Sequence, residues 1–569
     1  MILTYLLDKS EATEDEIRLA TKCSKDLINK MVKEGTLAYK ERVILNEESS
    51  DIELTSKYHF NIDQVQLIEK FKELGLKPYL LFSNDEEFKA QFYLQLINFY
   101  IKQDKQVVIF APTIMLLEEL HLYIKGYFKN LNIYTYHSKN SKSENYDTYM
   151  NVKYNKYNVL LTTSMGAFLP FDKLGMFIVI DEDNPNYIYE NFPYYDVREV
   201  LKQRASLLGV KLLFATPTPS VKAYYQSLLS QYYMLEYNIK NHNQVHIVDM
   251  KEEMLEENNT VISSLLHEQI KLALDENKIS MLIVNNKAYS TTIKCRECGK
   301  VLKCPKCKIP LTYFRNKNVA RCNYCDYKTE SHKTCECGSQ NLISLGFGLE
   351  QVRSKISMAF PKARIIQVDS DNVKVLDDYS NVLNAIEENE VDIIIGTIFL
   401  TKSLNYDNIK VVGMLYVDSY LNVNDHRGSE YTYNLIAKMT NKEVCILQTY
   451  NKDHYAIKNA AINDYESYYE KEIANREMLN YEPFTEMNKI TITGQFDKMY
   501  HFAYYYRKAI TYLIGDNVLG PSYDYKIKGV KLILKHNKHK EVVKVLNDSI
   551  RHFNEANLFV SFERYPKGM

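Results

Sequence analysis

Eight cysteines gathered in four close pairs are the residues of this chain whose type and spacing indicate the clearest chemistry. Intervals of five, fourteen and nine residues separate the pairs, which are Cys295/Cys298, Cys304/Cys307, Cys322/Cys325 and Cys335/Cys337. Thiolate sulfur is a soft ligand that Zn²⁺ binds tetrahedrally, and two cysteines on one tight turn supply half of a site. The eight thiolates therefore predict two closed structural zinc sites, which leave no coordination position for a substrate.

A disulfide framework is the alternative explanation for paired cysteines, and it requires an oxidising compartment. The segment from Met1 to Asp8 turns acidic too early for a signal peptide. No stretch approaches the roughly 18 apolar residues of a membrane span. We therefore expect two Zn²⁺, no membrane partner and a cytoplasmic, nucleoid-associated location. Cys23 and Cys445 lie far from the cluster and are expected to be ordinary buried thiols.

The size of the chain predicts several domains, because 569 residues exceed the roughly 100 to 200 of a typical domain. Its 71 basic and 72 acidic residues nearly cancel, so contact with nucleic acid would have to use local basic patches. Residues 291–340 hold eleven Lys/Arg against four Asp/Glu, and residues 526–544 hold seven Lys against one acid. The first surplus could instead neutralise the zinc thiolates, and the second could be a solvated face.

The first 50 residues have the pattern of a winged helix. Ser24 is placed to cap a helix whose apolar residues share one face, and Gly35 is placed to end that helix. Alternating residues from Leu37 to Leu45 would form the wing. Lys25 and Lys30 decorate the helix as side chains that contact a DNA groove would. Such small domains also serve as protein contacts, so both uses remain open.

Short apolar strands alternate with amphipathic helices from about residue 58, and this alternation predicts parallel sheets covered on both faces. The fold class is therefore multidomain α/β with two parallel-sheet lobes. The expected domains are a winged helix (1–50), lobe 1 (58–235), lobe 2 (236–294 and 341–465), a zinc-binding insertion (295–340) and an α+β C-terminal domain (470–569).

These pieces, in this order, resemble the PriA family of replication restart proteins, which are superfamily 2 DNA helicases. The resemblance is carried by the cysteine module and by Gly346 to Glu350, Gln448 to His454, Tyr481 to Phe484 and Pro193 to Val200. The resemblance runs from the winged helix to the C-terminus, and it implies that both parallel-sheet lobes are RecA-like. The family's own N-terminal domain, which captures a DNA 3′ end, has no counterpart in this sequence.

The resemblance implies a nested arrangement of zinc ligands. One zinc would be held by Cys295, Cys298, Cys335 and Cys337, and the other by Cys304, Cys307, Cys322 and Cys325. The last pair departs from the family pattern, since one residue separates Cys335 from Cys337 where the family has two. His332 is therefore a reserve ligand for this position.

The expected phosphate loop has lost the residues on which nucleotide binding depends. A working loop uses glycines that let backbone N–H groups surround phosphates at a helix N-terminus. Here Lys89 stands where the phosphate lysine belongs, but the segment from Ser83 to Ala90 contains no glycine and no magnesium-binding hydroxyl beside that lysine. Asp85, Glu86 and Glu87 would face the triphosphate, each at a cost of about 1 to 4 kcal/mol near 4 Å. ATP and Mg²⁺ are accordingly doubtful ligands.

The remaining motor motifs are partly kept. Asp181 and Glu182 follow a predicted strand and could hold magnesium and orient water, or they could be a vestigial acidic turn. Thr218 to Ser220 resembles the motif that couples the two lobes. In lobe 2, Gly396, Thr397 and Lys402 match the family, whereas Ser403 and Asn405 replace a glycine and an acid. No arginine occurs from Tyr431 to Glu443, so the arginine-rich motif is absent. Loss of the arginine that stabilises the transition state lowers the rate of ATP hydrolysis by about three to five powers of ten.

We therefore expect a PriA-like protein that binds forked or single-stranded DNA at stalled forks, helps to load the replicative helicase through primosome proteins or a loader, and has lost ATPase activity. An active 3′→5′ helicase and a zinc-module scaffold for proteins are the alternatives. Tyr313 and Phe314 could stack on bases or pack beside the zinc sites. Besides Lys25 and Lys30, the expected DNA contacts are Arg296, Lys300, Lys303, Lys306, Arg315, Arg321, Tyr187 and Tyr195.

Overall fold

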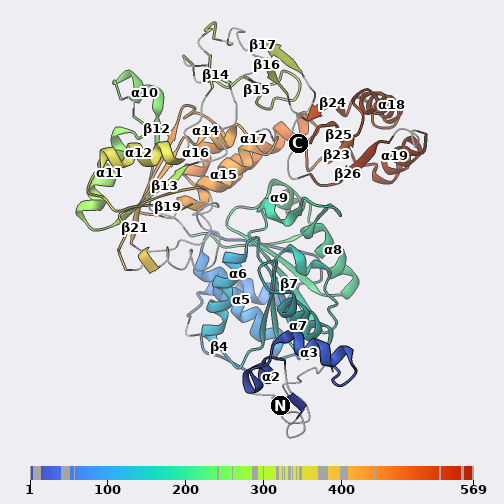
Figure 1. Cartoon of the computed structure of the whole chain (residues 1–569). Helices are drawn as coiled ribbons and strands as arrows, with labels where there is room; N and C mark the ends of the chain where they lie inside the picture. The colour runs from blue at the N-terminus through green and yellow to red at the C-terminus, as the bar shows by residue number, and fades with distance from the viewer. Residues whose placement is uncertain are drawn as a thin grey trace. The chain divides into compact units, whose positions relative to one another are not determined.

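The computed structural model consists of two compact units, residues 1–51 and 52–569, which are described separately below (Figure 1). The structure describes residues 2–3, 14–39, 52–56, 58–239, 243–258, 260–284, 293–295, 297–298, 300–314, 319–322, 325, 327–330, 335, 337–340, 342–344, 349–368, 382, 384–386, 388–397, 408–423, 425–440, 442–524, 527–552 and 557–566.

The N-terminal unit contains two described helices, α2 (Glu14–Thr21) and α3 (Lys25–Lys33). Ser24 caps α3 as predicted, since its side chain accepts a hydrogen bond from the Leu27 amide at 3.4 Å. Ile17 and Ile28 pack together in a small core. The expected wing lies mostly outside the described residues.

Lobe 1 is built on a seven-stranded sheet in the order β11-β2-β10-β7-β3-β6-β5, with every neighbouring pair parallel. Its strands are β2 (Tyr79–Phe82), β3 (Gln106–Phe110), β5 (Ile133–Tyr136), β6 (Val159–Thr162), β7 (Leu174–Ile180), β10 (Lys211–Thr216) and β11 (Tyr233–Glu236). Its helices are α4 (Ile62–Glu73), α5 (Glu86–Ile101), α6 (Ile114–Tyr127), α7 (Lys142–Lys153), α8 (Val197–Leu208) and α9 (Val221–Leu228), with 3₁₀ turns η1 (Ser164–Phe168) and η2 (Pro185–Tyr187).

Two short antiparallel ribbons accompany this sheet. One pairs β1 (Glu53–Leu54) with β4 (Phe128–Lys129), and the other pairs β8 (Ile188–Tyr189) with β9 (Tyr195–Asp196). Alternate residues of β3 enter two separate cores, with Val107 in one and Val108 in the other. Both faces of the sheet are therefore buried, as the uninterrupted apolar strands predicted.

Lobe 2 repeats the plan with a six-stranded parallel sheet in the order β12-β22-β21-β13-β20-β19. Its strands are β12 (Gln244–Asp249), β13 (Ile279–Val284), β19 (Ile365–Val368), β20 (Ile393–Gly396), β21 (Ile409–Leu415) and β22 (Val444–Thr449). Its helices are α10 (Met250–Leu255), α11 (Ser264–Asp275), α12 (Leu349–Ala359), α14 (Asp418–Leu421), α15 (Gly428–Met439), α16 (Tyr455–Ala461) and α17 (Tyr465–Met478). The two sheets confirm the predicted fold class.

Helix α17 continues past the boundaries expected at residues 465 and 470. Its residues Tyr465, Tyr468 and Tyr469 are buried in a core that includes strands of lobe 2. Helix α17 packs on α15 and α16 of lobe 2 and on α9 of lobe 1, so its tyrosines belong to a core that both lobes share.

The zinc-binding insertion follows β13. It contains the ribbon of β14 (Ile293–Cys295) with β18 (Leu342–Ser344), and a three-stranded antiparallel sheet of β15 (Thr312–Phe314), β16 (Val319–Arg321) and β17 (Lys328–Glu330).

The C-terminal domain is an antiparallel sheet in the order β24-β25-β23-β26, packed against two helices. Its elements are β23 (Glu486–Thr493), α18 (Phe496–Ile514), β24 (Val518–Asp524), β25 (Gly529–His536), α19 (His539–His552) and β26 (Phe559–Glu563). The lysine-rich segment near its end does not form a single solvated face, because Lys531 is buried on β25 and pairs with Asp524 at 3.0 Å.

Candidate functional site

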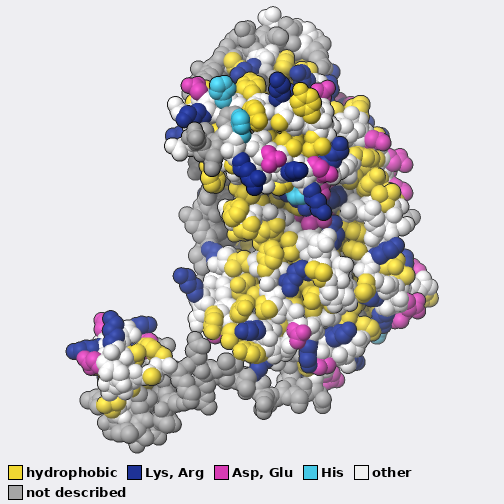
Figure 2. All heavy atoms as spheres, turned by 90° about the vertical axis from the view of Figure 1, so that its right-hand side faces the viewer, with side chains coloured by type: hydrophobic (Ala, Val, Ile, Leu, Met, Phe, Trp, Pro, Cys, Tyr) yellow, Lys and Arg dark blue, Asp and Glu magenta, His cyan; other side chains and the backbone are white. Residues whose placement is uncertain are grey.

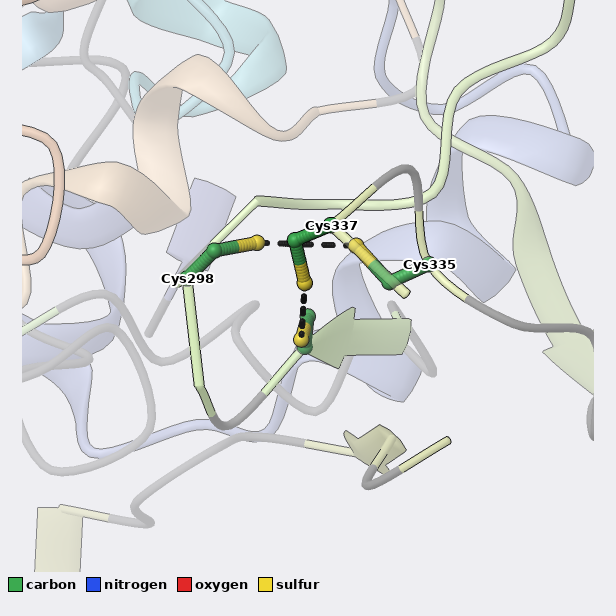
Figure 3. Close-up of side chains that lie close together, drawn as sticks. Cys298, Cys335 and Cys337 are labelled. Carbon is green, nitrogen blue, oxygen red and sulfur yellow. Dashed lines mark hydrogen bonds between the residues drawn. The ribbon is translucent and has the colours of Figure 1, made fainter. Parts of the chain in front are cut away.

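The eight paired cysteines come together in two groups of four, and the grouping is the nested one that the family resemblance implied. Within each group all four Sγ atoms lie within 4.8 Å of one another. The Sγ atoms of Cys298 and Cys335 lie 3.5 Å apart, and those of Cys295 and Cys337 and of Cys304 and Cys325 lie 3.6 Å apart. Ligands about 2.3 Å from a tetrahedral Zn²⁺ stand roughly 3.8 Å apart, so the spacing fits zinc and is far too long for a disulfide. Figure 3 shows the labelled sulfurs of the first group converging on one centre.

Each pair sits on a backbone turn closed by the amide of its first cysteine. The amides of Cys295, Cys304 and Cys322 donate to the carbonyl five residues later, at 2.8 Å in each case. The Cys335 amide donates to Ser339, four residues later, also at 2.8 Å. The last turn is thus one residue shorter, which explains how a pair with a single intervening residue still presents both sulfurs. The reserve ligand His332 lies outside the described residues and is not needed to complete the set.

The two cysteine groups differ in their surroundings. In the second group, Cys304 and Cys322 are fully buried in a cluster that includes Tyr481, Met487 and Ile533 of the segments leading into and forming the C-terminal domain. The Tyr481 hydroxyl donates to the Cys307 carbonyl at 3.2 Å. In the first group Cys337 is exposed and two further members are only partly buried. The second site therefore joins the insertion to its neighbours, and the first lies at the surface.

The phosphate loop of lobe 1 is reduced to three residues between β2 and α5. The carboxylate of Asp85 accepts a hydrogen bond from the Phe88 amide at 2.9 Å and caps α5. Backbone N–H groups at a helix N-terminus are the donors that a phosphate would require. Here the helix supplies its own anion, and Glu86 follows in the first turn.

Lys89 is committed to a neighbour on its own helix. Its ammonium lies 2.8 Å from a carboxylate oxygen of Glu86, and the side chain is only 5% exposed. A lysine that binds nucleotide must present its charge to the phosphates. This one is buried and neutralised by a carboxylate one turn away, so the arrangement of α5 opposes triphosphate binding.

The acidic turn after β7 is also engaged with protein groups. Glu182 accepts hydrogen bonds from the Ser220 amide at 3.0 Å and the Ser220 hydroxyl at 2.7 Å. Burial raises the pKa of the Glu182 carboxyl above its ordinary value, although Arg198 and Ser220 oppose the shift. Asp183 accepts from the Thr216 hydroxyl at 2.6 Å and from Lys438 at 2.9 Å. The carboxylates of Glu182 and Asp183 are therefore engaged by hydrogen bonds and an ion pair with other residues of the protein.

Helix α15 of lobe 2 faces this acidic turn, and it contains lysine but no arginine. Lys438 approaches Asp183 and, at 3.8 Å, Asp181. Of the lobe 2 positions compared with the family, Gly396 is the last residue of β20 and Thr397 follows it. Lys402, Ser403 and Asn405 lie outside the described residues.

The residues expected to contact DNA occupy different environments. Lys300, Lys303 and Lys306 are exposed in the insertion, and Lys25 and Lys30 are exposed on α3. Figure 2 shows Lys and Arg side chains scattered over the face in view. Arg296 and Arg315 lie outside the described residues, and only the backbone of Tyr313 and Phe314 is described.

Two members of the expected DNA-contact set are inside the protein. Tyr187 is fully buried, and its hydroxyl lies 2.9 Å from the Phe110 carbonyl and 2.5 Å from that of Ile180. Arg321 is 6% exposed. We correct the expectation for both, because a side chain enclosed by the fold has no surface to offer to DNA. Tyr195 remains half-buried and stacks on Tyr189.

Sequence reasoning missed Arg198 and Lys438. Arg198 binds Asp196 through two nitrogens and donates to the Glu182 carbonyl at 2.7 Å. Its place next to the aromatic segment could have marked it. Lys438 lies 255 positions from its partner Asp183, and no local pattern indicates that contact.

Comparison with known proteins confirms the resemblance to PriA. The family model for the PriA DNA helicase Cys-rich region (CRR) domain matches residues 304–329. The chain is 27% identical over 515 residues to the replication restart protein PriA of Bacillus subtilis (strain 168), covering 87% of this chain and 64% of that protein. It is 30% identical over 416 residues to the PriA of Borreliella burgdorferi, covering 71% and 62%. The chain thus spans less than two thirds of the length of these relatives.

Solved structures give a weaker likeness. The DUF1998 helicase MrfA bound to DNA matches with a TM-score of 0.40 and 11% identity, covering 70% of this chain and 50% of the other. RecG bound to a three-way DNA junction matches with a TM-score of 0.41 and 10% identity, covering 81% and 49%. At these scores the likeness indicates nothing further about this chain. Among the described helices, none combines the length and apolar character needed to cross a membrane.

Proposed function

We propose that this chain, which is similar to PriA replication restart proteins over most of its length, binds forked or single-stranded DNA and supports restart without hydrolysing ATP. The observation that carries the second half of the proposal is the capped N-terminus of α5, where Asp85 occupies the amide at which phosphate would bind. The paired zinc clusters and the family-model match support the first half.

Two further features of the described residues support the proposed loss of ATP hydrolysis. Lys89 is neutralised by Glu86, and α15 provides no arginine to the cleft. A triphosphate approaching α5 would meet carboxylates in place of free amides, with a repulsion of about 1 to 4 kcal/mol for each close approach. Micromolar affinity corresponds to only about −8 kcal/mol, so this repulsion suffices to remove most of it.

The proposed DNA surface lies on the insertion, where three exposed lysines follow one another along the chain: Lys300, Lys303 and Lys306. Lys25 and Lys30 on α3, and Tyr195 beside the short ribbon of lobe 1, are further proposed contacts. Arg296 and Arg315 stay proposals from the sequence alone. Loading of a replicative helicase through primosome proteins, and a cytoplasmic location with the nucleoid, complete the proposal.

The test is the affinity for a forked DNA measured across a salt series, together with phosphate release in the same samples. We expect steep salt dependence, because each phosphate neutralised releases counterions. Replacing Lys303 and Lys306 by Ala should weaken binding and lower the slope by about 1 for each lost contact. The matched control replaces the exposed Lys102 and Lys105 before β3, and it should change neither quantity.

Three outcomes of this test distinguish the proposed function from an active helicase and from a protein scaffold. Salt-dependent fork binding with no phosphate release supports the proposal. DNA-stimulated phosphate release that disappears in Lys89→Ala would identify a working helicase and refute it. Fork affinity that changes neither with salt nor on substitution of either lysine pair would favour the third candidate, in which the zinc module is a scaffold for proteins.

A further inference from the structure

Lys438 of α15 reaches from lobe 2 into the acidic turn of lobe 1. Its ammonium lies 2.9 and 3.1 Å from the two carboxylate oxygens of Asp183, and 3.8 Å from Asp181. The side chains of Lys438 and Asp183 are 18% and 6% exposed. Burial alone would lower the pKa of Lys438, but the nearby carboxylates outweigh it and raise that pKa. The ammonium is therefore charged and held between acids of the opposite lobe.

A second set of contacts ties the same two lobes beside this ion pair. Glu430 of α15 accepts a hydrogen bond from the Val221 amide at the start of α9, at 2.9 Å. The other oxygen of Glu430 binds Arg476 at 2.8 Å, and Arg476 in turn binds Glu472 at 2.8 Å. These charged groups are buried, so they are screened little by solvent and are costly to separate.

An apolar core also runs through the contact. Phe82 and Tyr224 of lobe 1 are buried in the same cluster as Tyr433 and Tyr465 of lobe 2. The ring of Tyr465 lies 5.4 Å from that of Phe82 and 4.9 Å from that of Tyr224. Its hydroxyl donates to the Pro219 carbonyl at 2.8 Å. The two lobes thus share both buried polar contacts and an apolar core.

We propose that Lys438 is a built-in cation of the interlobe cleft, which takes the place of a metal-bound nucleotide and holds lobes 1 and 2 closed. The ammonium pairs with Asp183 and also approaches Asp181, the acid expected to hold magnesium. This role rests on the proposed loss of nucleotide binding, and it assigns what occupies the cleft instead. A fork-binding surface spread over both lobes would then be ready without a nucleotide cycle.

The test follows the Val221 amide, because its hydrogen bond crosses the cleft. Hydrogen–deuterium exchange of a peptide covering Ser220 to Leu228 is measured by mass spectrometry in wild type and in Lys438→Met. We expect slow exchange in wild type, unchanged by Mg·ATP. In Lys438→Met exchange should rise about tenfold or more, since an uncompensated buried carboxylate destabilises the closed state.

Lys410→Met is the matched control. Lys410 lies on β21, is 13% exposed and pairs with Glu276, which belongs to lobe 2 as well. Its loss removes a more exposed ion pair within one lobe, in which Glu276 is 51% exposed, so exchange of the α9 peptide should not change. Zinc content and far-ultraviolet circular dichroism report whether each variant is folded. Asp183→Asn, which removes the partner charge from lobe 1, provides a second variant with the same expected result.

Two results would overturn the role of Lys438. The first is unchanged exchange of the α9 peptide in folded Lys438→Met or Asp183→Asn. The second is a wild-type peptide that becomes protected only when Mg·ATP is added. The measurement requires neither DNA nor hydrolysis, so failure of fork binding leaves it intact. ATP hydrolysis by wild type would refute the proposed function and, with it, the replacement of a nucleotide by Lys438. Faster exchange in Lys438→Met would then support only the closing of the two lobes by the ion pair.

Discussion

The two zinc sites should respond very differently to loss of one ligand. Cys322 is fully buried in a cluster with the large apolar side chains Tyr481, Met487 and Ile533, whereas Cys337 is exposed. At about 1.5 to 3 kcal/mol for each large side chain returned to water, loosening that cluster costs roughly 5 to 9 kcal/mol. This is comparable to the whole stability of a domain, about 5 to 15 kcal/mol. Cys322→Ser should therefore unfold more than its own site.

The assay combines zinc content with hydrogen exchange over β23 and β25. We expect one zinc per chain in both Cys322→Ser and Cys337→Ser. Only the first should accelerate exchange in the C-terminal strands. Cys445→Ser is the matched control, because Cys445 is equally buried but lies on β22, away from both sites. It should retain two zinc ions and normal exchange in the C-terminal strands. Equal acceleration in Cys322→Ser and Cys337→Ser would refute the reasoning.

Three further predictions follow from single contacts. Asp85→Ala should lower stability by about 0.5 to 2 kcal/mol in urea unfolding through loss of a helix cap, while Asp85→Asn stays within a few tenths and neither gains nucleotide affinity. Burial, with a smaller contribution from Lys303, lowers the pKa of His454 to about 4, and its Nδ1 accepts from the Ala456 amide. Between about pH 6.5 and 4 the unfolded chain therefore binds more protons at this histidine than the folded chain does. The free energy of unfolding should fall by up to about 3 kcal/mol as the pH drops through that window. His454→Asn should flatten this part of the stability–pH profile. Tyr187→Phe should lower the free energy of unfolding by about 1 to 2 kcal/mol, and with it the melting temperature, because two buried carbonyls lose their donor. The affinity for forked DNA should not change. Weakened fork binding in the folded variant would contradict the interior position of this residue.

The sequence predicts the sheets well because parallel strands buried on both faces are uninterrupted apolar runs. The apolar run Tyr79–Phe82 forms β2, and the run Val107–Phe110 forms β3 with one residue added at its start. Strand β5, Ile133–Tyr136, was not predicted. It lies at the edge of its sheet and is only half-buried, so tyrosine and threonine dilute the apolar signal.

Within the candidate sites, local spacing predicted some residues, whereas contacts made only in the folded protein were missed. All eight cysteine ligands were predicted, because knuckle spacing is local and written in the chain. The pairing of Lys438 with Asp183 was not, since the two residues meet only after both lobes have folded and docked. The burial of Tyr187 was missed for another reason: with 47 tyrosines in the chain, residue type does not separate surface rings from core rings.

The most direct test of the account is equilibrium titration of the full chain with Mg·ATP, by calorimetry, in the presence and absence of forked DNA. With Asp85 capping α5, Lys89 bound to Glu86 and Lys438 at the acidic turn, we predict no saturable binding up to millimolar nucleotide. Micromolar binding of one nucleotide per chain, abolished in Lys89→Ala, would contradict it.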